Sequence, residues 1–280
     1  MTKQFGLDWS VEKRPLVCGE TGSKTSSYGL FRSDTGLHLG TVGRLYTPYQ
    51  NESMIGVIND AASRLGYEVS RGGSLQGGRK VYAQVELDDT EIGNSNVKRY
   101  VTIINSHDGT HQVGVGMSNL VVVCSNQFNR MFKGGMNKVR HNYGVDLSVE
   151  SMVDRIVAGV KQEAEVIDMM QRMADQKYSE VMYDRVVSEI FKPVALDASP
   201  DGFARATARR EKGVAELSAC ISKDVEIHGD SIWGLFNGVT RFYTHYRGGA
   251  TEEKRMNFNM VGNGSNVVNE VFDILSLHVL

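Results

Sequence analysis

Three residues around a short turn have side chains that could bind a metal ion. His107, Asp108 and His111 lie within the sequence His-Asp-Gly-Thr-His, and imidazole and carboxylate groups are common ligands of catalytic zinc. A metal-dependent hydrolase would need a further carboxylate or histidine in a recognisable motif, and the sequence shows none. Asp-Gly is also typical of a tight hairpin turn. The pattern therefore favours a turn flanked by histidines, with no cofactor, and a metal-dependent enzyme acting on nucleic acids or nucleotides is the alternative.

A second group of residues has the composition of a nucleic-acid-binding surface. The segment 126–141 interleaves cations with aromatic rings and contains no acidic residue. Cations neutralise phosphates and aromatic faces stack on bases, so this combination is typical of proteins that bind single strands. The candidate contacts are Arg130, Lys133, Lys138, Arg140, His141, Phe128 and Phe132, with Arg79, Lys80, Lys98 and Arg99 at the ends of predicted hairpins. The alternative is a solvated connection whose phenylalanines pack into the core.

The composition limits where such a surface could lie. The formal net charge is −2 at neutral pH, so a binding site for a polyanion must be a local patch rather than a general basic coat. Cys18, Cys124 and Cys220 are far apart in the sequence, which predicts neither a disulfide framework nor a zinc site and fits a reduced, cytoplasmic protein. No apolar run is long enough for a membrane span, and no signal peptide is expected.

The N-terminal half reads as an arm followed by a mixed helix-and-strand region. Residues 18–36 are small, polar and glycine-rich, which predicts a flexible arm over 1–36. Apolar residues recur at helical spacing from Asn51 to Leu65, with Asn51 as the predicted N-cap and Gly66 as the stop. Alternating patterns then predict that 67–69 pair with the start of 80–87 and that a further strand covers 98–104. The last predicted strand is 117–126, whose continuous apolar run Leu120–Cys124 is expected to be buried on both faces. Short turns between successive strands make these an antiparallel meander.

The C-terminal half has helical periodicity throughout. One long helix is predicted from Ser148 to just before Pro193, followed by helices near 204–221 and 230–246 and a last helix capped by Ser265. The predicted fold class is α+β, with a helix and an antiparallel meander packed on a long helix and a helical C-terminal part. The predicted domains are the arm 1–36, a core 37–192 and a helical region 193–280. A long apolar stripe on a helix also favours a homo-oligomer.

Several motifs together resemble a known family. They are LGTVGRLYTPYQN (39–51), GGSLQGGRKVYA (72–83), NSHDG (105–109), VVCSNQF (122–128), VRHN (139–142) and DSIWGLFNGVTRFYTHY (230–246). Their order is similar to that of the phage- and plasmid-related family catalogued as domain of unknown function 932. The resemblance implies a mobile genetic element and no particular chemistry.

A remoter resemblance concerns the layout of the elements. A Gly-x-x-Tyr hook at Gly43–Tyr46, a helix, the pair Gly66-Tyr67, three antiparallel strands and a long helix are similar to the core of the Rad fifty-two-type single-strand annealing proteins. The resemblance implies a ring or filament that holds one DNA strand in a basic groove. We therefore expect a single-stranded DNA-binding, strand-annealing recombination protein of a phage or plasmid, located in the cytoplasm of the bacterial host. A third hypothesis is an anti-defence protein that binds a host protein.

Overall fold

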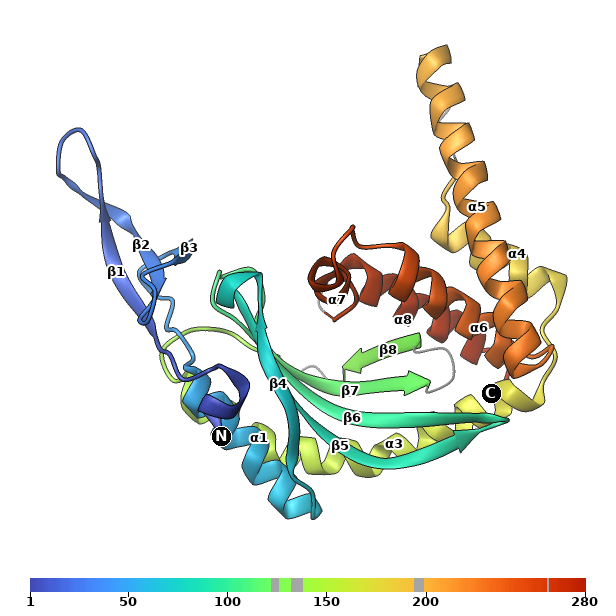
Figure 1. The fold of residues 1–280 in the computed structure, drawn as a ribbon, viewed down its shortest axis with the longest axis horizontal. Coiled ribbons are helices and arrows are strands. Elements are labelled where there is room, and N and C mark those ends of the chain that lie inside the picture. The colour runs from blue at the N-terminus through green and yellow to red at the C-terminus, as the bar shows by residue number, and fades with distance from the viewer. Residues whose placement is uncertain (122–125, 132–137, 194–198, 261) are drawn as a thin grey trace. The chain divides into compact units, whose positions relative to one another are not determined.

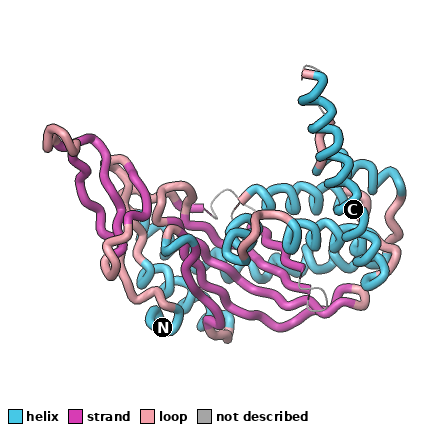
Figure 2. The backbone as a smooth tube through the Cα atoms, turned by 45° about the horizontal axis from the view of Figure 1, so that its top comes forward, coloured by secondary structure: helices cyan, strands magenta, loops and turns pink. Residues whose placement is uncertain are grey.

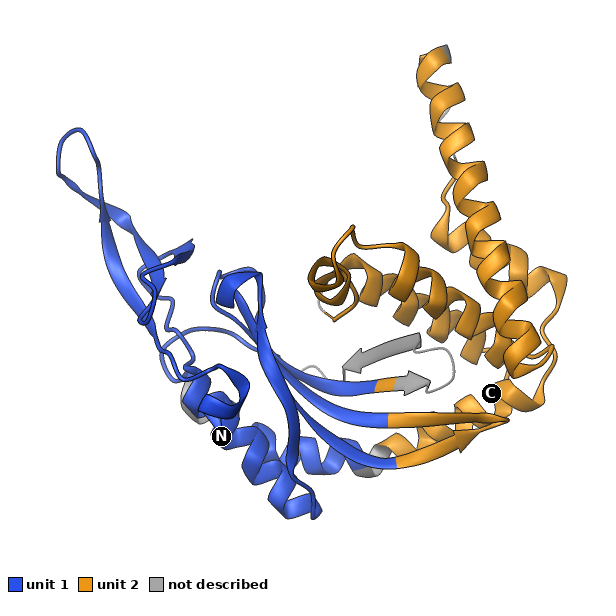
Figure 3. Ribbon diagram, in the orientation of Figure 1, with its two compact units in different colours: residues 1–88, 99–118, 131–162 blue, residues 89–98, 119–130, 163–280 orange. Residues whose placement is uncertain are grey.

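The computed structural model describes residues 1–121, 126–131, 138–193, 199–260 and 262–280 (Figure 1). The fold is α+β, and its sheets are antiparallel, as the sequence predicts (Figure 2). The chain divides into two compact units, which are described separately (Figure 3). Unit 1 comprises residues 1–88, 99–118 and 131–162, and unit 2 comprises residues 89–98, 119–130 and 163–280. None of the described helices is long and apolar enough to cross a membrane.

The strands form two sheets. The smaller sheet has the order β1-β2-β3, and the larger has the order β4-β5-β6-β7-β8 with β9 paired to β7. The strands are β1 (Val11–Val17), β2 (Lys24–Arg32), β3 (His38–Val42), β4 (Val69–Leu75), β5 (Lys80–Ile92), β6 (Ser95–Ser106), β7 (Val113–Val121), β8 (Asn126–Met131) and β9 (Lys138–Val139). An antiparallel pair does form here, but the predicted pairing of 67–69 with the start of 80–87 is wrong: Val69 pairs with Val85, and β4 continues to Leu75, which pairs with Lys80. Residues 113–119 are all buried, and the burial predicted for Leu120–Cys124 lies outside the residues whose side chains the structure describes.

The helices lie between and after the strands. They are the short 3-10 turns η1 (Thr2–Phe5) and η2 (Gln76–Gly78), the helices α1 (Asn51–Leu65), α2 (Val145–Glu150), α3 (Met152–Asp175), α4 (Glu180–Ile190), α5 (Pro200–His228) and α6 (Ile232–Arg241), the π-helical turn η3 (Phe242–Tyr246), and the helices α7 (Glu252–Met260) and α8 (Asn263–Ser276). In unit 1, apolar residues of α1, α2 and the start of α3 pack against strands β5 to β7, and this packing forms a single hydrophobic core.

The N-terminal residues belong to that core, and the predicted flexible arm is wrong. Leu7, Trp9 and Val11 are buried, and β1 pairs with β2 from Val11 opposite Arg32 to Val17 opposite Lys24, with a register shift between Pro15 and Val17. Gly19 and Gly22 lie in the turn between these strands, where Gly22 has a φ of 68°, and Gly29 lies within β2. Small polar residues on either side form an exposed hairpin rather than a disordered segment.

The first helix has the predicted bounds but a different cap. Helix α1 runs from Asn51 to Leu65, and Gly66 ends it with a φ of 82° in the left-handed region. Gln50 is the N-cap, and its side chain makes no capping hydrogen bond. The Asn51 side chain is buried and donates instead to the carbonyls of Leu7 and Trp9, at 3.3 and 2.9 Å.

The predicted long helix is divided into three. Helix α2 ends at Glu150, and the Ser151 hydroxyl donates to the Ser148 carbonyl at 2.7 Å, a local bond that competes with helix continuation. A second break separates α3 from α4, where the Ser179 side chain caps the new helix by accepting from the Met182 N–H. Apolar periodicity persists across both breaks, which is why the sequence predicts one helix.

Unit 2 is mainly helical and has its own core. Helix α5 contains the predicted segment 204–221, whereas the predicted segment 230–246 is divided into α6 and the π-helical turn η3. The last helix is confirmed but begins at Asn263, with Gly262 rather than Ser265 as its N-cap. Gly238 allows α6 to approach α5 closely, because a Cβ atom there would lie 2.4 Å from the Cα atom of Ile221. The unit boundaries differ from the predicted domain limits at 36 and 192, since Glu163–Leu280 and the tip of the β5–β6 hairpin form one unit.

Candidate functional site

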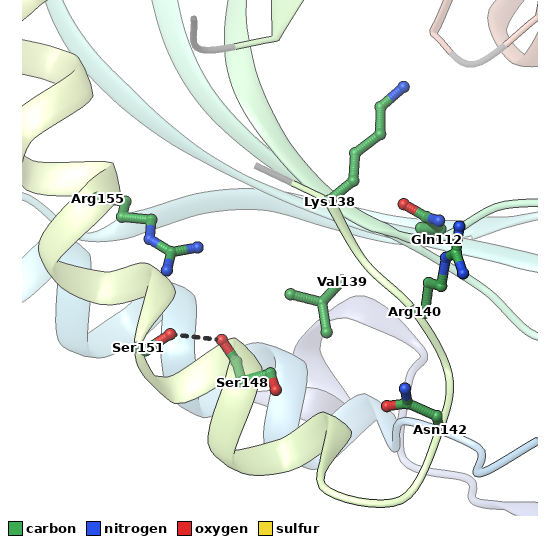
Figure 4. A pocket seen from close by; sticks show the side chains of 8 residues that line it. All are labelled: Gln112, Lys138, Val139, Arg140, Asn142, Ser148, Ser151 and Arg155. Carbon is green, nitrogen blue, oxygen red and sulfur yellow. Dashed lines mark hydrogen bonds between the residues drawn. The ribbon is translucent and has the colours of Figure 1, made fainter. Parts of the chain in front are cut away.

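An open pocket of about 520 Å³ lies within unit 1 (Figure 4). Its volume is in the range typical of sites for small organic ligands. Strand β9, the loop after it, the start of β7 and the helices α2 and α3 supply its lining. The lining residues are Gln112, Lys138, Val139, Arg140, Asn142, Ser148, Ser151 and Arg155.

Local pairing brings these residues together. Val139 pairs with Val113 and Lys138 with Gly114, so β9 places its cation beside the start of β7. The chain then turns, with the Asn142 N–H donating to the Arg140 carbonyl at 2.9 Å, and enters α2 at the buried Val145. The pocket is therefore formed by a strand end, a turn and the beginning of a helical segment.

The lining is positively charged. Three of the eight lining side chains, those of Lys138, Arg140 and Arg155, are cationic, and none of those eight is acidic. Lys138 and Arg140 are exposed, and in Figure 4 the Arg155 guanidinium extends from α3 toward the pocket. Cations gathered in the lining of one cleft favour the binding of anions. Gln112, Asn142, Ser148 and Ser151 add polar groups to the lining, although the Ser151 hydroxyl already donates to the Ser148 carbonyl.

The His141 side chain is buried and holds the loop after β9 against the core of unit 1. The residue is 8% exposed and stacks on Tyr46, with ring centroids 4.7 Å apart and ring planes at 17°. Burial lowers the pKa of His141 to about 4, although the nearby backbone groups of Thr47 and His111 act in the opposite direction. The prediction of His141 as a phosphate contact is wrong, because the imidazole is buried and uncharged at neutral pH.

The Asp108 turn is a compact hydrogen-bonded hairpin connection. Asp108 Oδ1 accepts from the Ser106 hydroxyl at 2.6 Å and from the Thr110 N–H at 2.9 Å. Burial on its own raises the pKa of Asp108, but these bonds and the Thr110 hydroxyl outweigh it, so the carboxyl pKa lies below its ordinary value. Gly109 has a φ of 77°, which glycine adopts without strain.

The His107 side chain is buried in the core of unit 1 and hydrogen-bonded there. Its Nε2 atom lies 2.8 Å from Asn51 Oδ1, and the Asn51 amide nitrogen already donates to two carbonyls, so His107 must carry its proton on Nε2. Burial, followed by the effect of His141, lowers the pKa of His107 to about 3. In the described ranges, no three His, Cys, Asp or Glu side chains are arranged to hold a metal ion. The geometry thus gives no support to a metal site at His107, Asp108 and His111.

The other predicted contacts are dispersed. Lys80 is 6% exposed and lies close enough to Asp108 for the two charges to interact, so the prediction that it contacts phosphate is wrong. Arg79 is exposed beside this turn, and its carbonyl accepts from the His107 N–H at 2.7 Å. Lys98 and Arg99 are half-buried on β6 and do not line the pocket.

Four predicted residues lie beyond what the structure describes. Phe128, Arg130, Phe132 and Lys133 are outside the residues whose side chains are described. Conversely, the sequence gives no signal for Gln112 and Arg155, because they reach the pocket only through the pairing of β9 with β7 and the start of α3.

A Ser-His-Asp arrangement occurs in unit 2, but it is structural. Ser95 Oγ lies 2.7 Å from His228 Nδ1, and His228 Nε2 lies 3.5 Å from Asp224 Oδ1. Ser95 is 1% exposed and accepts from the Trp233 indole N–H at 3.2 Å, so a substrate carbonyl cannot reach its oxygen. Arg241 pairs with the same buried carboxylate of Asp224. The arrangement ties the β5–β6 hairpin to α5 and α6.

Comparison with known proteins defines the class of this chain. The sequence profile of the family described as a domain of unknown function, DUF932, matches residues 38–261. The chain therefore belongs to this family. A search of curated proteins and a search of solved structures each found no match.

Proposed function

We propose that this protein binds single-stranded DNA and promotes the annealing of complementary strands, as a homo-oligomer that requires neither nucleotide nor metal. The observation that carries the proposal is the pocket of unit 1, in which Lys138, Arg140 and Arg155 line an open cavity without an acidic neighbour in its lining. A phosphodiester backbone is a polyanion that such cations would bind, because each Lys or Arg that neutralises a phosphate releases condensed counterions. The phage or plasmid setting is proposed from the resemblance to family 932, and the ring or filament form from the resemblance to the annealing proteins.

The proposed mechanism is charge neutralisation. Cations along the bound strand replace its counterions and reduce the repulsion that opposes the approach of a complementary strand. The bases must remain accessible for pairing, and an open surface pocket meets this requirement better than an enclosed one. No covalent step is involved.

The test is annealing of fluorescently labelled complementary oligonucleotides, with particle size measured on the same samples with and without DNA. The double variant Lys138→Glu, Arg140→Glu should lose most of the binding and the annealing. The control variant Lys3→Glu, Lys24→Glu makes the same change of net charge at exposed positions outside the pocket and should keep both activities. Unchanged annealing by the pocket variant would remove this pocket from the proposal. Absence of single-strand binding by the unaltered protein at low salt would refute the function itself.

A further inference from the structure

Tyr143 presents a solvent-exposed aromatic ring beside the cationic pocket. The residue is 98% exposed and directly follows Asn142, which lines the pocket. Single exposed apolar residues are common on protein surfaces and need no explanation alone. Here the backbone around the ring and the adjacent cations supply two further observations.

A β-turn fixes the position of this ring. The Val145 N–H donates to the Asn142 carbonyl at 3.0 Å, and Gly144 has a φ of 89°. A positive φ at the third residue is characteristic of a type II turn, which requires glycine there. Tyr143 is the second residue of the turn, at its corner, so its side chain projects away from the protein.

Both ends of the turn are anchored in the core of unit 1. His141 is stacked on Tyr46 before the turn, and Val145 is fully buried after it. The backbone that carries the ring is therefore ordered before any ligand arrives. An exposed group held in this way loses little conformational entropy on binding, which favours a recognition role.

We infer that Tyr143 is a base-stacking residue, so that the site recognises unpaired nucleotides with a phosphate in the cationic pocket and a base on the Tyr143 ring. This inference rests on the proposed function and specifies its substrate as a single strand. In a duplex, each base is covered on both faces by its neighbours and offers no free face to a protein ring. A single strand offers such a face at every nucleotide, whatever its sequence.

The experiment compares two ligands that differ only in their bases. Affinities are measured for a labelled oligodeoxythymidine and for an abasic oligomer of the same length, which keeps the phosphodiester backbone. Tyr143→Ala should weaken binding of the oligodeoxythymidine about tenfold and leave binding of the abasic oligomer unchanged. Tyr143→Phe keeps the ring and should retain the affinity. Tyr246→Ala removes another exposed tyrosine, in unit 2, and should have no effect.

The outcomes separate this inference from the proposed function. If Tyr143→Ala weakens binding of both oligomers equally, or of neither, the base-stacking role is refuted while single-strand binding stands. If the unaltered protein binds neither oligomer at low salt, the proposed function fails and the inference fails with it. Because Tyr143 makes almost no contact with the core, the substitution should not affect folding, and a thermal unfolding measurement on each variant checks this.

Discussion

The imidazole of His141 lies flat on the phenol ring of Tyr46, and this pair joins the loop of the cationic pocket to the core of unit 1. A backbone hydrogen bond from the Thr47 N–H to the His141 carbonyl, at 3.1 Å, reinforces the contact. The Tyr46 hydroxyl in turn donates to the Ser106 carbonyl at 2.9 Å. The loop that carries Arg140 is therefore positioned by residues that are far from it in the sequence.

The first prediction concerns this stacked pair. Tyr46→Phe removes only the hydroxyl bond and should lower the free energy of unfolding by about 1 kcal/mol. Tyr46→Ala also removes the ring and should lower it by about 3 kcal/mol. Urea unfolding of the two variants measures the difference. Equal losses in the two variants would show that the stacking contact does not stabilise the loop.

The second prediction is a loss of stability in mild acid. His107 and His141 have pKa values lowered to about 3 and about 4 in the folded protein, whereas the unfolded chain binds these protons near pH 6.5. The unfolded state therefore holds more protons below pH 6.5, and stability should fall by roughly 1.4 kcal/mol per pH unit for each histidine as the pH decreases toward 5.

Urea midpoints measured between pH 7.5 and 5 test this dependence, because most carboxylates do not titrate in that range. His141→Asn should flatten the dependence, and the control His38→Asn, at an exposed position, should not. A pH profile that is the same in all three proteins would contradict the burial of His141 as a neutral ring.

The third prediction concerns the close approach of α5 and α6. Gly238→Ala should destabilise the protein by several kcal/mol, on the order of 3, because the new Cβ would lie 2.4 Å from the Cα atom of Ile221, which cannot move without shifting the helix. Gly56→Ala is the matched control, since Gly56 is also helical and its Cβ would meet nothing within 4 Å. That substitution should be stabilising by about 0.5 to 1 kcal/mol. A similar effect of both substitutions on the midpoint of thermal unfolding would exclude the tight crossing.

The fourth prediction is a defined salt dependence of single-strand binding. Three cations that each contact a phosphate should give a slope of about −2 in a plot of log affinity against log salt concentration. Lys138→Gln removes one contact and should reduce the magnitude of the slope by about 0.7. Fluorescence anisotropy with a labelled oligonucleotide at several salt concentrations measures both slopes. An unaltered slope in the variant would show that Lys138 does not contact the backbone of the strand.

Sequence patterns predict the local elements of this fold well. The bounds of α1 follow from short-range signals, namely apolar spacing and a terminating glycine, and alternation predicts β5, although not its register with β4. The division of the long helix at Ser151 and Ser179 is not predictable in this way. Its causes are a side-chain bond and a cap within a segment whose apolar period continues across both breaks.

The sequence predicts only part of the candidate site, because composition identifies cations but not the long-range contacts that bury or gather them. Composition identifies Lys138 and Arg140 as exposed cations in an acid-poor segment, and both line the pocket. The same composition gives no indication that Lys80 and His141 are buried, because burial depends on contacts with Asp108 and Tyr46 that are distant in sequence. Arg155 reaches the pocket from a helix that follows the acid-poor segment. The pairing of β9 with β7 therefore helps to decide which cations line the pocket.

The Asn51 amide group has a consequence for how much of the chain is needed for folding. The buried Asn51 amide donates hydrogen bonds to the carbonyls of Leu7 and Trp9 and accepts one from the imidazole of His107. The region that matches the family profile begins only at residue 38. A chain cut to residues 38–261 would leave this amide without its acceptors and would also discard helix α8, whose apolar face belongs to the core of unit 2. We therefore expect residues 38–261 by themselves to be less stable than the whole chain.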